Sequence, residues 1–89
     1  MLHETITSLA GPEVLARAKR FFAERVPHQG AFLEHEGERH ATFRGQGGEE
    51  LTVAVFESNE GTLVRASTLL FDQAIGRFFS TLPVVRARS

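Results

Sequence analysis

The chain has 89 residues, of which 42% are hydrophobic and 24% charged, which is the composition of one small globular domain. Ten Lys and Arg against eleven Asp and Glu give a formal net charge of -1, so no overall basic field favours nucleic acid or anionic lipid. The lack of cysteine excludes disulfides, thiolate metal sites and cysteine nucleophiles. The first residues lack the positive charge of a signal peptide and no apolar run has the length of a membrane span, so we expect a cytoplasmic protein.

The first third of the chain predicts a short strand followed by an amphipathic helix. Polar and apolar residues alternate over 5–9, as they do in a strand. Pro12 and Glu13 suit the first turn of a helix, because proline loses no hydrogen bond there and a carboxylate lies at the positive helix end. Pro27 ends this helix, since the residue before a proline avoids the α region. The apolar stripe of the helix consists of Val14, Leu15, Ala18, Phe21, Phe22 and Val26.

Beyond this helix the hydrophobic period changes to two, which predicts an antiparallel meander. Three turn segments, at 37–38, 45–48 and 58–61, separate the strands. A second amphipathic helix over about 70–82 follows the meander and ends at Pro83. The four expected strands lie at about 31–36, 39–45, 50–57 and 62–69.

These elements predict a single α+β domain over 1–83 with a short flexible tail at 84–89. A four- to five-stranded antiparallel meander sheet, in the order β-α-β-β-β-β-α, carries both helices on one face in this two-layer fold, because each helix has one stripe to bury. The order resembles a single repeat of the TATA-binding-protein-like fold, and also a minimal START-like helix-grip fold. The first resemblance implies a homodimer and the second a small ligand. No counterpart of a DNA-binding motif is present, so nucleic-acid binding is not implied.

Centring the hairpin turns fixes which strand residues lie opposite each other and sorts the side chains between two faces. The first turn is centred between Gly37 and Glu38, the second near residue 47, and the third between Asn59 and Glu60. The predicted pairs are Leu33 with Thr42, Phe32 with Phe43, His35 with His40, Thr42 with Thr52, Phe43 with Leu51, Val53 with Ala66, Ala54 with Arg65, Val55 with Val64 and Phe56 with Leu63. The face expected under the helices collects Phe32, Ala41, Phe43, Leu51, Val53, Val55, Val64, Ala66 and Thr68.

The opposite face of the predicted sheet is too apolar for ordinary solvent surface and too polar for a core. Exposed apolar patches mark partner or ligand sites, although scattered apolar residues on a sheet are also common. We expect a non-catalytic interaction module that forms a homodimer through this face. A binder of a small apolar or weakly anionic ligand is the first alternative. The candidate interface or ligand-binding residues are Leu33, His35, His40, Arg44, Ala54, Phe56, Leu63 and Arg65.

His35 and His40 form the pattern nearest to a metal or catalytic site. Directly opposed side chains have Cβ atoms roughly 4.5 to 5.5 Å apart and can share a metal ion, but zinc needs a third or fourth ligand. No carboxylate accompanies the two rings, so we expect no metal, no cofactor and no catalytic residue, and a histidine-based enzyme or metal protein is the second alternative. The glycine-rich 45–48 segment lacks the Lys-Ser or Lys-Thr of a phosphate loop and predicts a hairpin loop.

Overall fold

A computed structural model describes residues 2–24, 32–45, 50–68 and 72–83. These residues form a five-stranded antiparallel sheet and two helices in the order β-α-β-β-β-β-α, which confirms the predicted α+β class. The expected tail at 84–89 and the expected end of the first helix at Val26 lie outside the described residues. The elements are β1 (Leu2–Thr7), α1 (Gly11–Glu24), β2 (Phe32–Glu36), β3 (His40–Arg44), β4 (Glu50–Ser58), β5 (Gly61–Thr68) and α2 (Asp72–Ser80).

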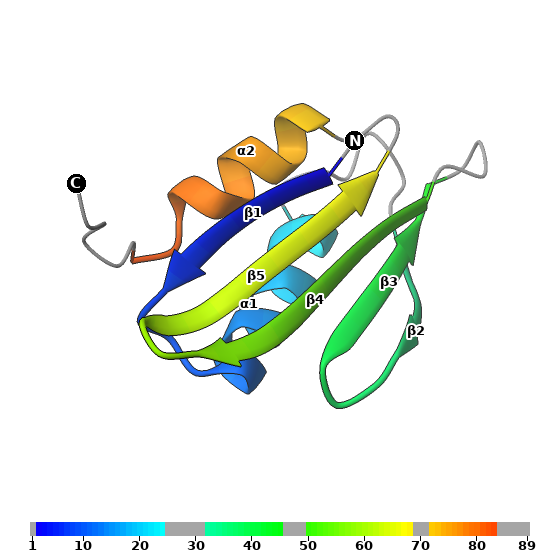
Figure 1. Cartoon of the computed structure of the whole chain (residues 1–89). Coiled ribbons are helices and arrows are strands. Elements are labelled where there is room, and N and C mark those ends of the chain that lie inside the picture. Colours follow the sequence, from blue (N-terminus) through cyan, green and yellow to red (C-terminus); the bar gives the residue numbers. More distant parts are fainter. Residues whose placement is uncertain (1, 25–31, 46–49, 69–71, 84–89) are drawn as a thin grey trace.

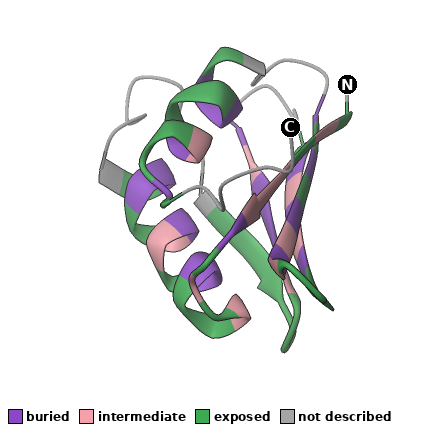
Figure 2. Cartoon of the chain, turned by 60° about the vertical axis from the view of Figure 1, so that its left-hand side comes forward, coloured by how far each residue is buried: buried purple, intermediate pink, exposed green. Residues whose placement is uncertain are grey.

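The sheet is open, and its strand order is β1-β5-β4-β3-β2. Strands β2 to β5 follow one another as the predicted meander, and β1 pairs antiparallel with β5 on the side away from β4. Both helices lie against one face of the sheet, so the molecule has two layers (Figure 1). Figure 2 shows the buried positions of the helices on the side that faces the strands. No described element covers the opposite face of the sheet, which we call the outer face.

Aromatic packing joins the two helices to the sheet. The Phe22 ring of α1 has its centroid 5.2 Å from that of Phe43 on β3 and 5.6 Å from that of Phe78 on α2. All three side chains are at most 2% exposed. Burying large rings of this kind dominates core energetics. The sheet residues predicted to face the helices are buried wherever their side chains are described: Ala41, Phe43, Leu51, Val53, Val55, Val64, Ala66 and Thr68.

The start of α1 lies unusually close to β4. The Val14 amide donates to the Ala10 carbonyl at 3.0 Å, which closes the first helical turn. A Cβ atom on Gly11 would lie only 3.0 Å from Cγ2 of Val55. Glycine at this position therefore allows the helix to approach the strand without displacing the Val55 side chain.

The hairpin between β4 and β5 has the predicted register. The pairs Val53 with Ala66, Val55 with Val64 and Phe56 with Leu63 are all present. Its turn requires a glycine, because Gly61 has a φ of 141°. The Ser58 hydroxyl further closes this turn by donating to the Gly61 carbonyl at 3.0 Å.

The predicted register between β2 and β3 is wrong. The Gly37 amide donates to the His40 carbonyl at 2.9 Å, so the turn is centred one residue later than expected. His35 consequently pairs with Thr42 instead of with His40. The register also shifts between Leu33 and His35. A bulge of this kind inserts an extra residue into one strand and changes the partners of every residue beyond it.

The bulge changes the partners of the first two residues of β2. Leu33 lies opposite Phe43 and Phe32 opposite Arg44, whereas the sequence predicts Thr42 and Phe43 as their partners. The pairs between β3 and β4, Thr42 with Thr52 and Phe43 with Leu51, agree with the prediction. The error is therefore confined to the edge strand.

Neither α1 nor α2 is long and apolar enough to cross a membrane.

Candidate functional site

The outer face of the sheet carries a line of three apolar side chains across β1, β5 and β4. The register places Ile6 opposite Leu63, and Leu63 opposite Phe56. Phe56 is 40% exposed, and Ile6 and Leu63 are half-buried. We call these three residues the apolar row. Ala54 lies two positions along β4 from Phe56 on the same face, and it extends the apolar surface toward β3.

Arg65 lies beside the apolar row with its charge already compensated. Its Nε donates to Glu4 Oε2 at 2.6 Å across the pair of β1 and β5. Its Cζ atom also lies 5.4 Å from the centroid of the Phe56 ring, within the range of a cation–π contact. Arg65 is therefore held between a carboxylate and an aromatic ring of its own chain.

Arg44 is compensated in the same way at the other end of the outer face. Its Nε donates to Glu34 Oε2 at 2.9 Å, and its Nη2 donates to Glu50 Oε2 at 3.4 Å. The hydrogen bond from Arg44 lowers the pKa of the Glu34 carboxyl below its usual value, and the same bond raises the pKa of Arg44. The two arginines predicted to bind a ligand or a partner are thus both paired within the chain.

A polar band separates the two ends of the outer face. The hydroxyl oxygens of Thr42 and Thr52 lie 3.1 Å apart across β3 and β4, at hydrogen-bond distance. This contact satisfies two polar groups on strands that also carry core residues. The apolar row consequently lies on β1, β5 and β4, and the polar band lies beside it on β4 and β3.

His35 and His40 lie together although they are not directly opposed. Their ring centroids are 5.0 Å apart in an edge arrangement, and the His40 ring lies over Gly37, where a Cβ atom would be 2.6 Å from its Cε1. Within 2–24, 32–45, 50–68 and 72–83, no group of three or more His, Cys, Asp or Glu side chains has the arrangement of a metal site. The two rings thus form a contact at the turn without a third ligand from the described residues.

Leu33 belongs to a different part of the molecule from the other predicted interface residues. It is 40% exposed on the edge strand β2 and pairs with Phe43, which contacts α1, so the register places Leu33 on the helix side of the sheet and its predicted position on the outer face is wrong. Ile6 takes its place beside Phe56 and Leu63, a position that the sequence reasoning missed. The alternation around Ile6 indicates a strand, but only the pairing of β1 with β5 shows which face of the sheet it joins.

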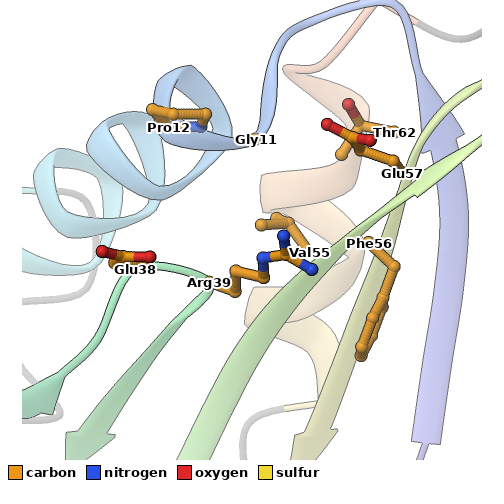
Figure 3. A pocket seen from close by; sticks show the side chains of 8 residues that line it. All are labelled: Gly11, Pro12, Glu38, Arg39, Val55, Phe56, Glu57 and Thr62. Atoms are coloured by element: carbon orange, nitrogen blue, oxygen red, sulfur yellow. The ribbon is translucent and has the colours of Figure 1, made fainter.

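A cavity of about 380 Å³ lies on the helix side of the sheet, where α1 begins (Figure 3). It is partly open to solvent. The sequence did not predict it, because its lining comes from three separate segments that only the fold brings together. The start of α1 contributes Gly11 and Pro12, the turn before β3 contributes Glu38 and Arg39, and β4 and β5 contribute Val55, Phe56, Glu57 and Thr62.

The backbone positions Arg39 at this cavity. The Val55 amide donates to the Arg39 carbonyl at 2.9 Å, which continues the ladder of β3 and β4 by one residue. Figure 3 shows the Arg39 side chain beside the Val55 side chain and across from the start of α1, with Glu38 and Glu57 on opposite sides of it. Arg39, Glu38 and Glu57 form no ion pair with any residue of the described segments.

No protein-family model, curated protein or solved structure matches this chain significantly. The arrangement of its own residues is therefore the basis for assigning a function.

Proposed function

We propose that the chain is a non-catalytic interaction module that forms a homodimer through the outer face of its sheet. The observation that carries this proposal is the apolar row, in which Phe56 is 40% exposed beside Leu63 and Ile6. A phenyl ring left in water beside two aliphatic side chains is unfavourable, and removing apolar area from water stabilises by about 25 cal/mol per Å². Covering this row is the simplest way to gain that free energy.

The charges of the outer face favour a second copy of the chain as the covering partner. Arg65 is paired with Glu4, and Arg44 with Glu34 and Glu50, inside each protomer. A partner that covers the row therefore does not need to supply a countercharge, and neither arginine is desolvated without its carboxylate when the face is covered. A charged partner would gain little from arginines that are already compensated.

Two-fold symmetry gives this contact a closed form. In an isologous dimer the same patch meets its own copy, so an apolar row is placed against an apolar row. The polar band of Thr42 and Thr52 then lies toward the rim, where interfaces are hydrated. A domain of 89 residues has one small core, and burial in a dimer adds to its stability.

Sedimentation velocity of the whole chain at about 10 to 100 μM, neutral pH and moderate salt tests this proposal. We expect the wild type to sediment as a dimer of the 9.9 kDa chain. Phe56→Glu places a carboxylate in the centre of the apolar row and is expected to give a monomer, because burying an unpaired charge is costly. Ala16→Glu, a matched change at an exposed position of α1, should leave the dimer intact.

Circular dichroism of the same samples separates loss of association from loss of folding. The proposal requires that Phe56→Glu keeps the helix and strand signal of the wild type while its mass is halved. A wild type that stays monomeric over the whole concentration range contradicts self-association. A dimer that Phe56→Glu leaves unchanged shows that the chain associates through another surface, and it contradicts the proposal as well.

A further inference from the structure

The cavity at the start of α1 brings together one cation and two carboxylates that do not neutralise one another. Arg39, Glu38 and Glu57 all line it, and none of the three forms an ion pair within the described segments. Several other charged side chains of this fold are paired, among them Arg17 with Glu13 and Lys19 with Glu36. The cavity therefore presents both signs of charge separately within one small space.

Arg39 is suited to bind a carboxylate. Its planar guanidinium offers a fork of N–H donors that matches two carboxylate oxygens, and Figure 3 shows it beside Val55, across the cavity from Pro12. The wall that faces it is the first turn of α1, a helix of 14 residues whose N-terminus carries partial positive charge. Arginine and helix end together favour an anionic group on this side of the cavity.

Glu57 and Thr62 lie together on the other side of the cavity and are suited to bind a cation (Figure 3). The Thr62 hydroxyl donates its proton to the Leu9 carbonyl at 2.7 Å, so only the lone pairs of its oxygen are left for a ligand. A carboxylate and a hydroxyl acceptor side by side offer two acceptors to an ammonium group. Glu38, on the turn, adds a further negative charge to the lining.

The size and the apolar lining of the cavity limit the rest of the ligand. A volume of about 380 Å³ lies at the small end of the range for small-molecule sites. Between the charged groups the walls are the Val55 side chain and the Pro12 ring, which accommodate a short aliphatic group. A ligand with a carboxylate alone leaves the two glutamates without a countercharge, and one with an amine alone leaves Arg39 without one.

From these groups we infer that the cavity binds a small zwitterion that carries both a carboxylate and an ammonium group, as a free aliphatic amino acid does. Arg39 binds the carboxylate, Glu57 and Thr62 accept from the ammonium, and Val55 and Pro12 contact the aliphatic part. This site lies on the helix side of the sheet and is distinct from the proposed dimer surface. Of the cavity residues, only Phe56 also belongs to the apolar row.

Titration of the whole ¹⁵N-labelled chain with L-leucine, followed by amide chemical shifts, tests this inference. We expect saturable shifts at the amides of Gly11, Val55 and Thr62, with a Kd of about 1 mM, as suits a small ligand with few contacts. Two analogues remove one charge each. We expect 4-methylpentanoate, which lacks the ammonium, and 3-methylbutylamine, which lacks the carboxylate, to bind roughly tenfold more weakly or worse.

Two arginine variants show whether the binding depends on this cavity. Arg39→Gln is expected to weaken L-leucine binding roughly tenfold or more while leaving amide shifts distant from the turn unchanged. Arg20→Gln, at an exposed arginine of α1 that also forms no ion pair within the described segments, should bind L-leucine as the wild type does.

Three results would overturn the inference. The first is the absence of saturable shifts with L-leucine at about 20 mM, far above the expected Kd. The second is equal binding by Arg39→Gln and the wild type. The third is equal binding of an analogue that carries only one of the two charges.

Discussion

On β4, Val53 and Val55 lie under the helices and are 0% and 4% exposed, whereas Phe56, the next residue of the strand, is 40% exposed on the outer face. Phe43 of β3, which has the same side chain as Phe56, is 2% exposed because it contacts Phe22 of α1. The two phenylalanines differ only in whether a helix covers their side of the sheet. Exposure here is decided by the layer order of the fold and not by the hydrophobicity of the residue.

This difference indicates that the two faces contribute differently to the protein. The helix side holds the residues whose burial stabilises the monomer, among them Phe22, Phe43 and Phe78. The outer face holds apolar area that the monomer leaves in contact with water. Substitutions on the first face should mainly change the stability of the monomer, and substitutions in the apolar row of the second should mainly change association.

The largest expected effect is the difference in lost stability between alanine substitutions at Phe43 and at Phe56. Phe43→Ala leaves a cavity among the rings of the core and should cost about 3 to 5 kcal/mol of unfolding free energy. A loss of that size is comparable with the whole stability of a small domain. Phe56→Ala, measured at a low micromolar concentration that keeps the chain monomeric, should cost less than about 1 kcal/mol because little burial is lost.

Urea unfolding followed by circular dichroism measures both values. The comparison between the faces requires a clear separation of the two midpoints, with Phe43→Ala unfolding at much lower urea. Similar losses at the two positions would mean that the outer face is already covered in the monomer. That result would also remove the basis for the proposed dimer.

Much of the helix side was predictable from the sequence, since strand alternation and helical stripes both report burial. The turn of β4 and β5 is marked by Ser58 and Gly61, and its predicted register is correct for every pair from Val53 to Phe56. The shared stripes of the two helices then require one common face. Layer order and core residues follow from these two facts alone.

The edge strand β2 was not predictable in the same way. Moving a turn centre by one residue changes each partner by two residues and leaves every side chain on its face, so the alternation carries no signal against the wrong register. This is why His35 and His40 share a face although their predicted pairing is wrong. The bulge between Leu33 and His35 depends on local backbone geometry, and the residue types there do not indicate it.

The remaining parts of the site depend on contacts between distant segments. Ile6 joins the apolar row only through the pairing of β1 with β5, two strands at opposite ends of the chain. The cavity depends on Gly11, Arg39 and Val55, which come from three different elements. Hydrophobic periodicity describes one element at a time and contains no information on such neighbours.

Alanine substitutions at two helical glycines are expected to change the stability by an intermediate amount. A Cβ atom at Gly11 would lie 3.0 Å from Val55 Cγ2, and Val55 is fixed within the sheet. Gly11→Ala should therefore destabilise the protein by about 1 kcal/mol, at the low end of overpacking effects. A thermal unfolding curve should show the lower midpoint directly.

Gly76 of α2 is the matched control for this substitution. It is exposed, and a Cβ atom there would have no neighbour within 4 Å in the described segments. Gly76→Ala should stabilise the protein by about 0.5 to 1 kcal/mol through the helix preference of alanine and a less flexible unfolded chain. If both substitutions stabilise the protein, the close approach of α1 to β4 does not hold.

The smallest effect concerns pH and the outer face. The hydrogen bond from Arg44 holds the pKa of Glu34 below its ordinary value of 4.5, so the folded chain binds this proton more weakly than the unfolded chain does. The stabilisation by this pair is therefore fully present above pH 4.5, and it is lost as the pH falls through the lower pKa of the folded state. In Glu34→Gln this contribution is absent at every pH.

The unfolding midpoints of wild type and Glu34→Gln should thus differ slightly at about pH 7 and converge toward about pH 3. Glu38→Gln, at an exposed carboxylate without an ion pair in the described segments, controls for the general effect of removing a negative charge. A difference that grows on acidification would show that Arg44 does not favour the charged form of Glu34. The charge compensation on which the proposed dimer surface depends would then be weaker at that end of the outer face.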